Sequence, residues 1–310
     1  MVNLEIEIPD GFFEEEERCG YLVTKQMKEV WAIEIDLAVK LINVCKKYSL
    51  RLSAEGGTLL GAVRHQGFIP WDDDIDFYMP REDYQNLCEV AKKEFFHPYD
   101  FVNFHTDPHF ACGCAKLVNE LTTGYHNPYF GHHGIFIDIF PVDKWSDDDK
   151  EVERQYKNAI SLFKKYQRVV TCSRPDYWME SGISFAHRMV RLFLYLKLKL
   201  LNRKVGSRYQ VKLFKEFEKE CTKFNHLDTK RCCKVSIFSK KNNNCDDFFH
   251  IVETKFEFTK FPIIENYDET LKVQYGDWHQ YVKGGSLHTF MILDTDRPYK
   301  EVLKERGIKY

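Results

Sequence analysis

Apolar residues recur at helical spacing near the start of the chain, at Val23, Met27, Val30, Leu37, Leu41, Val44 and Cys45. This period predicts a long amphipathic helix over residues 21–48 that covers the core. The same period predicts a helix over Arg81–Phe96. Ser146–Asp149 has the composition of a capping box, and it predicts the start of a further long helix that runs to about Val170.

Shorter apolar runs predict strands over residues 51–54, 74–79, 115–118 and 135–140. The first run ends at Gly56-Gly57, where a helical turn over Thr58–Arg64 is expected to begin. Pro80 stops the second run. Lys240–Asp247 is a polar, low-complexity stretch and is expected to form a loop.

Residues 181–215 differ chemically from the rest of the chain. They contain nine Lys or Arg, no Asp or Glu, and the leucine-rich run MVRLFLYLKLKLL. A basic and apolar helix of this kind can lie on an anionic membrane surface. It can equally pack on the protein core with its basic side chains turned to solvent. The sequence leaves both interpretations open.

Length and charge narrow the class of protein. A chain of 310 residues can bury a substantial core, and a net charge of −2 argues against a general nucleic-acid binder. The acidic start MVNLEIEIPDGFFEEEE shows no secretory signal, and no apolar run reaches the ~18 residues of a membrane span. We therefore expect a cytoplasmic protein, with peripheral contact to the inner face of a membrane through 181–215 as one option.

Ten cysteines are scattered along the chain, and we expect them to be reduced and mostly buried thiols. The Cys112–Cys114 segment lies near His105 and His109. Neither this segment nor the pair Cys232-Cys233 has the two-residue spacing of a zinc knuckle. The cysteines therefore give little indication of a metal site.

The stretch EGGTLLGAVRHQGFIPWDDDIDFYM, from Glu55 to Met79, holds the densest candidate chemistry. Because side chains alternate along a strand, Asp74 and Asp76 are expected on one face. Two carboxylates on one face repel each other, and Mg²⁺ or Mn²⁺ between them would relieve the repulsion and bridge to phosphates. Asp72 and Asp73 would assist or stay solvated. The alternative, an acidic surface turn, is disfavoured because the acids continue into an apolar strand.

A further acid, Asp138, lies inside the apolar run 135–140. A buried carboxylate is costly without a partner, so Asp138 needs a cation or hydrogen-bond donors nearby. If its strand pairs beside residues 74–79, the carboxylates of Asp74, Asp76 and Asp138 converge on one metal site. The alternative is a hydrogen-bonded structural acid. Asp143, at the exit of the run, is expected to be a loop or capping residue.

Gly56, Gly57 and Thr58 stand at the expected start of a helix, where backbone N–H groups and a hydroxyl can bind a phosphate. Arg64 is suited to neutralise a diphosphate through bidentate hydrogen bonds. His65 follows it and suits a structural role as well as a catalytic one. Phosphate-binding groups and acids thus lie within one short supersecondary unit.

Three segments together resemble the LicD family of phosphocholine-type transferases, of which fukutin-related proteins are distant relatives. They are GGTLLGAVRHQGFIPWDDDID, GIFIDIFPVD and YGDW at Tyr275–Trp278, and they follow the family's order across about residues 20–290. The resemblance implies an α+β fold with a nucleotidyltransferase-like mixed sheet flanked by helices. The domains it implies are an N-terminal segment at 1–20, a catalytic core at 21–170, a basic helical insertion at 171–230, and a C-terminal part at 231–310 that completes the core and the acceptor site.

The resemblance also implies a reaction. Enzymes of this family move a phospho-alcohol group such as phosphocholine from a CDP-alcohol to a glycan hydroxyl and release CMP. The acceptor is commonly a sugar of a lipid-linked or cell-surface glycan, such as lipopolysaccharide or teichoic acid. The residues that match the family's site are Asp74 and Asp76 as metal ligands, Asp138 as the third acid, Gly57 and Thr58 at the phosphates, and Lys116 as a basic residue.

One segment departs from the family pattern. Family members often continue with a proline-containing loop after the Tyr-Gly-Asp segment, whereas this chain reads HQYVKGGSLH. This segment is expected to shape the alcohol or acceptor pocket, so the transferred alcohol (choline, ribitol or glycerol) stays open. His288 within it is a candidate site residue, although loop histidines more often have no catalytic role.

In the expected reaction, Mg²⁺ held by Asp74 and Asp76 offsets charge on the diphosphate and on the departing CMP. Asp138 completes the metal site or takes the proton of the acceptor hydroxyl. One rival is a nucleotidyltransferase that passes NMP from an NTP to a small molecule, and another is a non-catalytic nucleotide-binding protein. The complete set of acids disfavours the non-catalytic rival, and the charge balance disfavours nucleic-acid modification.

Overall fold

The computed structural model describes residues 1–125, 131–175, 178, 184–282 and 292–308. Its helices are α1 (Lys25–Lys47), α2 (Gly56–Arg64), α3 (Arg81–Glu94), α4 (Asp149–Cys172), α6 (Phe185–Leu200), α7 (Arg208–Cys221), α8 (Tyr267–Tyr275) and α9 (Tyr299–Glu305), with 3₁₀ turns η1 (Val235–Ile237) and η2 (Cys245–Phe249). Its strands are β1 (Glu16–Arg18), β2 (Tyr21–Val23), β3 (Ser53–Ala54), β4 (Asp76–Pro80), β5 (Tyr99–Val102), β6 (Ala115–Asn119), β7 (Thr123–Tyr125), β8 (Ile135–Lys144), β9 (Arg231–Cys233), β10 (Asn243–Asn244), β11 (Ile251–Phe256), β12 (Thr259–Ile264) and β13 (Ile292–Asp294).

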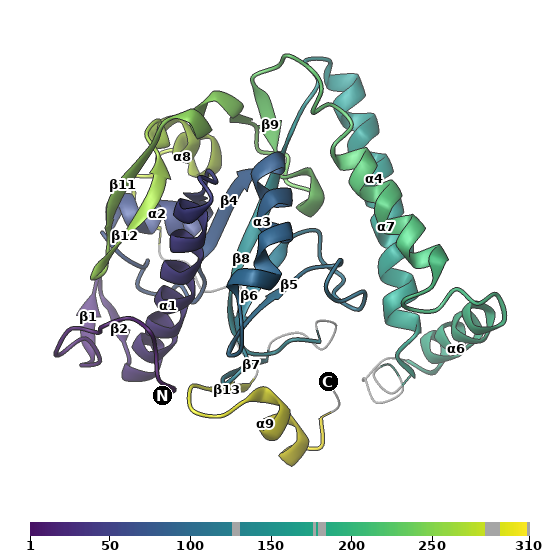
Figure 1. Cartoon of the computed structure of the whole chain (residues 1–310), viewed down its shortest axis with the longest axis horizontal. Coiled ribbons are helices and arrows are strands. Elements are labelled where there is room, and N and C mark those ends of the chain that lie inside the picture. The colour runs from purple at the N-terminus through teal and green to yellow at the C-terminus, as the bar shows by residue number, and fades with distance from the viewer. Residues whose placement is uncertain (126–130, 176–177, 179–183, 283–291, 309–310) are drawn as a thin grey trace.

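A mixed sheet lies at the centre of the molecule (Figure 1). The long strand β8 pairs in parallel with β4, which pairs antiparallel with β3. The first half of β8 pairs antiparallel with β6, and its last residues pair antiparallel with β9. Strands β5 and β10 extend the sheet beyond β6 and β9. Helices flank this sheet, so the predicted α+β fold is confirmed.

One face of the sheet carries the main apolar core. Phe77 and Met79 of β4 and Ile137 and Ile139 of β8 belong to one buried cluster with the apolar residues of α1. Figure 1 shows α1 and α3 covering this face. Because side chains alternate along a strand, the intervening residues of β4 and β8 point to the opposite face.

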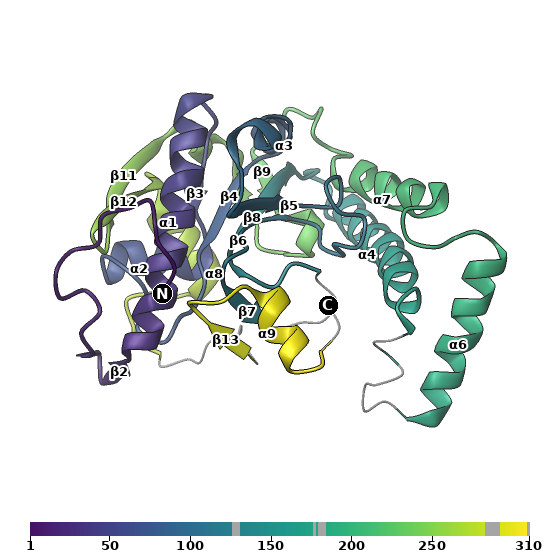
Figure 2. The same cartoon turned by 60° about the horizontal axis from the view of Figure 1, so that its bottom comes forward.

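Helices α4 and α7 form a second apolar cluster beside the sheet (Figures 1 and 2). Their aromatic rings interlock, with the centroids of Phe163 and Phe217 4.9 Å apart and those of Tyr166 and Phe214 5.2 Å apart. Helix α6 lies between them in the chain and projects outward from this pair (Figure 2). No helix among the described residues has both the length and the apolar composition needed to cross a bilayer.

The predicted starts of the first helix and the second strand are wrong by a few residues. At both places a threonine side chain accepts a hydrogen bond from a backbone N–H group. The first helix begins at Lys25 rather than residue 21, since Tyr21–Val23 pairs with β1 and Thr24 caps the helix by accepting from Met27 N at 3.3 Å. The second strand begins at Asp76, so Asp74 lies in the preceding loop.

The predicted capping box at Ser146 is also wrong. The side chain of Asp148 caps α4, accepting from Lys150 N at 2.8 Å, while Ser146 Oγ accepts from Asp148 N at 3.1 Å. The predicted loop at residues 240–247 instead contains β10 and the start of η2.

Asp143 is not a loop or capping residue, contrary to the prediction. It lies within β8 with 1% exposure and receives two hydrogen bonds from Arg81, at 2.9 and 2.6 Å. Asn225 donates a third at 2.9 Å. The structure therefore gives Asp143 a structural role that joins α3 to the sheet.

The ten cysteines are all free thiols, and six of them are buried. Cys112 and Cys114 lie close together, with 2.8 Å between their sulfur atoms. Burial raises the pKa of Cys45 and of Cys88 to about 12, which keeps these thiols protonated. Cys45 and Cys88 therefore behave as small apolar side chains that fill space in the protein interior.

Candidate active site

The loop between α2 and β4 carries three consecutive acids. Carboxylate oxygens of Asp72, Asp73 and Asp74 lie within 4.8 Å of one another. Asp73 is buried, and the indole N–H of Trp31 donates to the backbone oxygen of Asp72 at 2.9 Å. The loop is therefore held against α1 with its acids gathered, and it is not an open, solvated turn.

Asp76 and Asp138 lie side by side at the centre of the sheet. They are direct register partners on the parallel strands β4 and β8, which places their Cα atoms about 4.8 Å apart and their side chains on one face. Asp76 Oδ1 is buried and has no hydrogen-bond partner among the described residues. Burial, followed by the charges of Asp74 and Asp138, raises the pKa of Asp76 well above its ordinary range.

Lys116 of β6 brings a cation to the same point. It is the register partner of Asp138 on the other side of β8, and its Nζ donates to Asp138 Oδ2 at 3.2 Å. Both side chains are less than 10% exposed. The thiol of Cys114 lies 3.6 Å from the other carboxylate oxygen. Lys116 and Cys114 are thus the donors that the buried Asp138 requires.

These acids fit a divalent cation. A buried carboxylate oxygen that lacks a donor, next to several further carboxylates, is an arrangement that a hard cation satisfies. Asp74, Asp76 and Asp138 remain the predicted ligands. Because carboxylate oxygens of Asp72 and Asp73 lie within 4.8 Å of one another and of Asp74, these two acids are further candidate ligands of the cation.

Gly56 and Gly57 leave room for the acidic side chains to lie close to the start of α2. A Cβ at Gly57 would lie 2.5 Å from Asp72 Oδ2, and Gly56 has φ +57, a conformation that favours glycine. The Thr58 hydroxyl accepts from the backbone N–H of Asp76 at 2.8 Å. The positive end of the helix dipole therefore faces acids of the chain itself. Phosphate binding by these three residues remains a prediction.

Arg64 and His65 lie at the other end of α2. Arg64 Nη1 donates to the backbone oxygen of Trp278 at 2.9 Å, and its guanidinium lies 4.8 Å from the Tyr281 ring centroid. His65 Nε2 accepts from Arg64 Nε at 3.0 Å. Burial and the neighbouring Arg64 charge lower the pKa of His65 to about 4, so this imidazole is neutral near pH 7. The described contacts tie both residues to the segment after α8 and leave their predicted substrate role as a prediction.

The sequence interpretation missed Glu34. This residue of α1 is fully buried, and neither carboxylate oxygen has a hydrogen-bond partner among the described residues. Burial, and then the charges of Asp73 and Asp74, raise the pKa of Glu34 well above the ordinary range. An acid inside the apolar period of residues 21–48 was the signal that could have identified it.

The sequence interpretation also missed a buried ion pair between a lysine and a glutamate, which lies over the sheet face that carries Asp76 and Asp138. Lys234, just before η1, donates to the Glu55 carboxylate, and Gln274 Nε2 donates to the same oxygen at 3.0 Å. The Lys234 ammonium lies 5.8 Å from the ring centroids of both Tyr78 and Phe140. No local pattern announces this pair, because its two members are 179 residues apart.

Tyr275, from the weak Tyr-Gly-Asp-Trp motif, reaches the site as well. Its hydroxyl and Asp76 Oδ2 both lie 3.8 Å from the position of a Cβ on Gly56. Burial and the acids Asp72 and Asp76 raise the pKa of this tyrosine. The divergent segment spans His279–His288, and its part from residue 283 onward, which includes the predicted candidate His288, lies outside the described residues.

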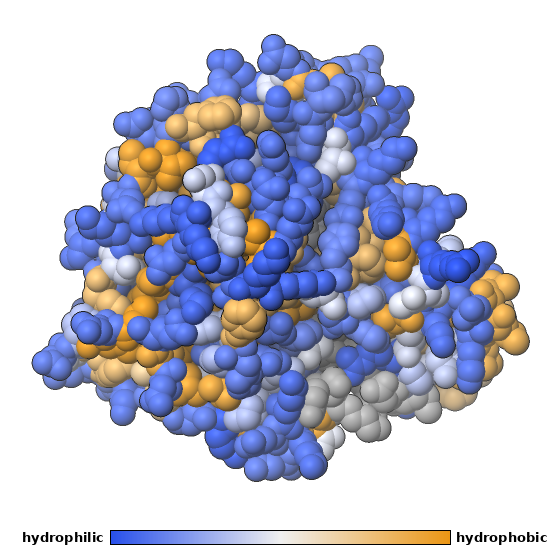
Figure 3. All heavy atoms as spheres, in the orientation of Figure 1, coloured by the Kyte–Doolittle hydropathy of each residue, from blue (hydrophilic) through white to orange (hydrophobic). Residues whose placement is uncertain are grey.

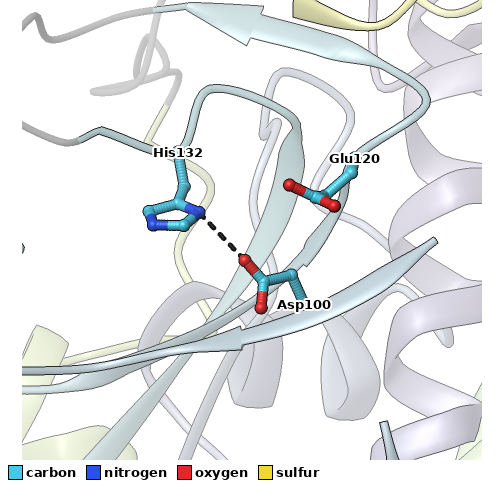
Figure 4. Close-up of side chains that lie close together, drawn as sticks. All are labelled: Asp100, Glu120 and His132. Carbon is cyan, nitrogen blue, oxygen red and sulfur yellow. Dashed lines mark ion pairs between the residues drawn. The ribbon is translucent and has the colours of Figure 1, made fainter. Parts of the chain in front are cut away.

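Figure 4 shows a different acidic group, formed by Asp100, Glu120 and His132. His132 Nδ1 lies 2.9 Å from Asp100, and its Nε2 lies 3.2 Å from Asp107. Burial opposes the charge on this histidine, but the two carboxylates outweigh it and raise the pKa of His132 to about 9. The group is therefore an ion-pair network around an imidazolium.

Residues 49–168 match the family of LicD/FKTN/FKRP nucleotidyltransferase domains. The lipopolysaccharide cholinephosphotransferase LicD of Haemophilus influenzae is 26% identical over 243 residues, which cover 76% of this chain and 84% of that protein. The human ribitol 5-phosphate transferase FKRP is 27% identical over 116 residues, which cover 36% of this chain and 23% of FKRP. The family resemblance indicated by the motifs is therefore confirmed, and the matched span contains the acids and Lys116.

Proposed function

Since residues 49–168 are a LicD/FKTN/FKRP nucleotidyltransferase domain, we propose that this protein transfers a phospho-alcohol group, phosphocholine by preference, from a CDP-alcohol to a glycan hydroxyl. CMP is the second product. The observation that carries the proposal is the alignment of Asp76 with Asp138, and of Asp138 with Lys116, on one sheet face inside the matched span. The similarity to a cholinephosphotransferase over most of both chains supports choline as the alcohol.

The proposed step is a phosphoryl substitution. The acceptor oxygen forms a bond to the phosphorus that bears the alcohol, and the bond from this phosphorus to the bridging oxygen breaks. CMP leaves with that oxygen, and the acceptor proton passes to Asp138 and then to solvent. A bound Mg²⁺ or Mn²⁺ would supply charge neutralisation at the diphosphate and the leaving group.

We assign the residues of the chain to binding the cation and orienting the phosphate groups. Asp74 and Asp76 would hold the cation, whereas Asp138 is assigned as the acceptor of the proton. Lys116 would orient the Asp138 carboxylate through its buried contact at 3.2 Å. The N–H groups at the start of α2, from Gly57 and Thr58, would orient the non-bridging phosphate oxygens.

A second candidate, transfer of NMP from an NTP, is favoured by one finding, the nucleotidyltransferase character of the matched domain. The two functions differ in their products, because this reaction releases pyrophosphate whereas phospho-alcohol transfer releases CMP. The acceptor of the favoured reaction is proposed to be a lipid-linked or cell-surface glycan, since the LicD relative is named for lipopolysaccharide.

The test incubates the protein with Mg²⁺, candidate glycan acceptors and a panel of CDP-choline, CDP-ribitol and CDP-glycerol. We expect release of CMP from CDP-choline and a gain of phosphocholine in the acceptor mass. Release of pyrophosphate from NTPs, with no CMP from any CDP-alcohol, would favour the second candidate. Turnover of CDP-ribitol alone would retain the reaction class and correct the alcohol.

A further inference from the structure

Helix α6 differs from the other described α-helices, each of which has at least two buried residues. None of its sixteen residues is buried, although the helix is rich in leucine and aromatic side chains. Leu198 packs against the apolar cluster of α4 and α7, and Leu194 and Leu198 line a cavity together with Val169 of α4. Figure 2 shows α6 projecting beyond α4 and α7. Packing on the protein core, one of the two interpretations of residues 181–215, therefore accounts for Leu198 but leaves most of α6 exposed.

The outward side of α6 is a continuous apolar stripe. With 3.6 residues per turn, its six members fall within an arc of about 100° on the helix. Phe185, Phe193 and Leu200 are 78%, 66% and 85% exposed. Figure 3 shows apolar surface at the right edge of the molecule, over this helix. The members of the stripe are Phe185, Met189, Leu192, Phe193, Leu196 and Leu200.

Basic residues border the stripe. On the helical wheel, Lys199 lies next to one edge of the arc and Lys197 next to the other, and both are exposed. Arg203 and Lys204 follow the helix, and residues 181–215 contain no Asp or Glu. The pairing of an apolar face with basic edges is complementary to a bilayer that has anionic headgroups.

The charge pattern also decides against a second copy as the occupant. Packing two such stripes against each other would bring the lysine edges of both helices together, at a cost in like-charge repulsion. An apolar groove on another protein would leave these lysines without anionic partners. An anionic lipid surface satisfies both parts of the helix at once, because Lys side chains extend from an apolar face to the headgroups.

We propose that α6 is a membrane-surface helix, which lies in the interface of an anionic bilayer with its apolar stripe against the acyl chains. This inference rests on the exposed helix and its charges, and it stands apart from the proposed reaction. For an enzyme that uses a lipid-linked acceptor, the helix would hold the catalytic sheet at the surface where that acceptor resides.

The test is sedimentation of the full chain with unilamellar vesicles. One set contains phosphatidylcholine alone, and the other contains equal parts of phosphatidylcholine and phosphatidylglycerol. We expect binding to the anionic vesicles that weakens with added salt, and little binding to the neutral vesicles. Equal binding to both sets, or none to either, would overturn the proposal.

Two substitutions with matched exposure locate the surface. Phe193→Glu on the stripe should weaken vesicle binding at least about tenfold. Phe96→Glu, at a phenylalanine 65% exposed outside α6, should leave binding unchanged. A Phe193→Glu variant that binds as tightly as the wild type would contradict the proposal. So would a lipid-free dimer that this substitution dissociates, because the stripe would then join two copies.

A charge variant and an activity control complete the design. Lys197→Glu combined with Lys199→Glu should reduce binding to the anionic vesicles and flatten its salt dependence. Release of CMP with a water-soluble acceptor should be the same for Phe193→Glu and the wild type. Loss of vesicle binding with CMP release intact therefore separates this surface from the catalytic site.

Discussion

Asp76 combines more constraints than the other acids described in the site. Its backbone N–H is bound by Thr58, its register partner is Asp138, and one of its oxygens is buried without a donor. The sequence identified this residue from its place in an acidic run that enters an apolar strand. It did not indicate that the strand begins at Asp76 itself, so that Asp74 lies in the preceding loop.

The substitution Asp76→Asn should lower CMP release by roughly 10²–10⁴-fold, because an amide can neither neutralise a divalent cation nor carry the negative charge that holds it. The fold should persist, since the contact with Thr58 uses the backbone N–H. Steady-state kinetics and circular dichroism check both expectations. Asp149→Asn, at an acid 85% exposed and paired with Arg231, is the control and should keep wild-type turnover. Near-normal activity of Asp76→Asn would remove Asp76 from the site.

His132 gives a prediction for stability against pH. Its pKa is raised to about 9 by Asp100 and Asp107, against the opposing effect of burial. A raised pKa means that the stabilisation is complete below the unfolded-state value of about 6.5 and is lost as the pH rises through about 9. His132 is partly exposed, so the contribution is discounted to about 1–2 kcal/mol.

The check compares the wild type with His132→Gln by urea unfolding at several pH values. The difference in unfolding free energy should be largest near the unfolded-state pKa and below it, and small at the alkaline end of the series. A difference that stays constant across the series would show that the imidazolium does not stabilise the fold through Asp100 and Asp107.

At the scale of elements, the Arg81–Asp143 pair fastens α3 to β8. Both side chains are buried, at 9% and 0% exposure, and Asn225 from the segment after α7 donates to the same carboxylate. The pair therefore joins three parts of the chain that are far apart in the sequence. The sequence interpretation treated Asp143 as a loop residue because it did not extend the strand beyond Phe140.

Replacing Arg81 with Met should destabilise the protein by about 3 kcal/mol, because the buried Asp143 would lose its cationic partner and keep only Asn225 as a donor. Arg154→Met is a matched control, since Arg154 is 62% exposed and pairs with Glu151 on the surface of α4. It should cost less than about 0.5 kcal/mol. Denaturant midpoints measure both, and equal losses would contradict the assigned role of the buried pair.

For the whole molecule, a divalent cation should act as a ligand of the folded state. At about 100 times its dissociation constant, Mg²⁺ would add about 2.7 kcal/mol to the free energy of unfolding, which raises the Tm by roughly 5 °C in a chain of this size. Calorimetric melting with Mg²⁺ and then with excess chelator checks this expectation. The shift should vanish in Asp76→Asn and persist in Asp149→Asn. A shift of the same size in both variants would place the cation elsewhere.

Local features of this protein could be predicted from its sequence alone. The glycine pair fixed the start of α2, and the apolar periods gave α1 and α3 to within a few residues. The alternation of acids with apolar residues around Asp76 indicated a site before any fold was known. These features depend on neighbours within a few residues, which is the range over which propensity and periodicity act.

Which distant groups meet depends on how the whole chain folds. Strand register placed Asp138 between Asp76 and Lys116, and the packing of α1 buried Glu34 behind the acids. The fold also paired Lys234 with Glu55 and left α6 with its apolar stripe in solvent. The periodicity of a segment shows that it has an apolar face, but whether that face is covered depends on the whole packing of the chain, which no local pattern contains.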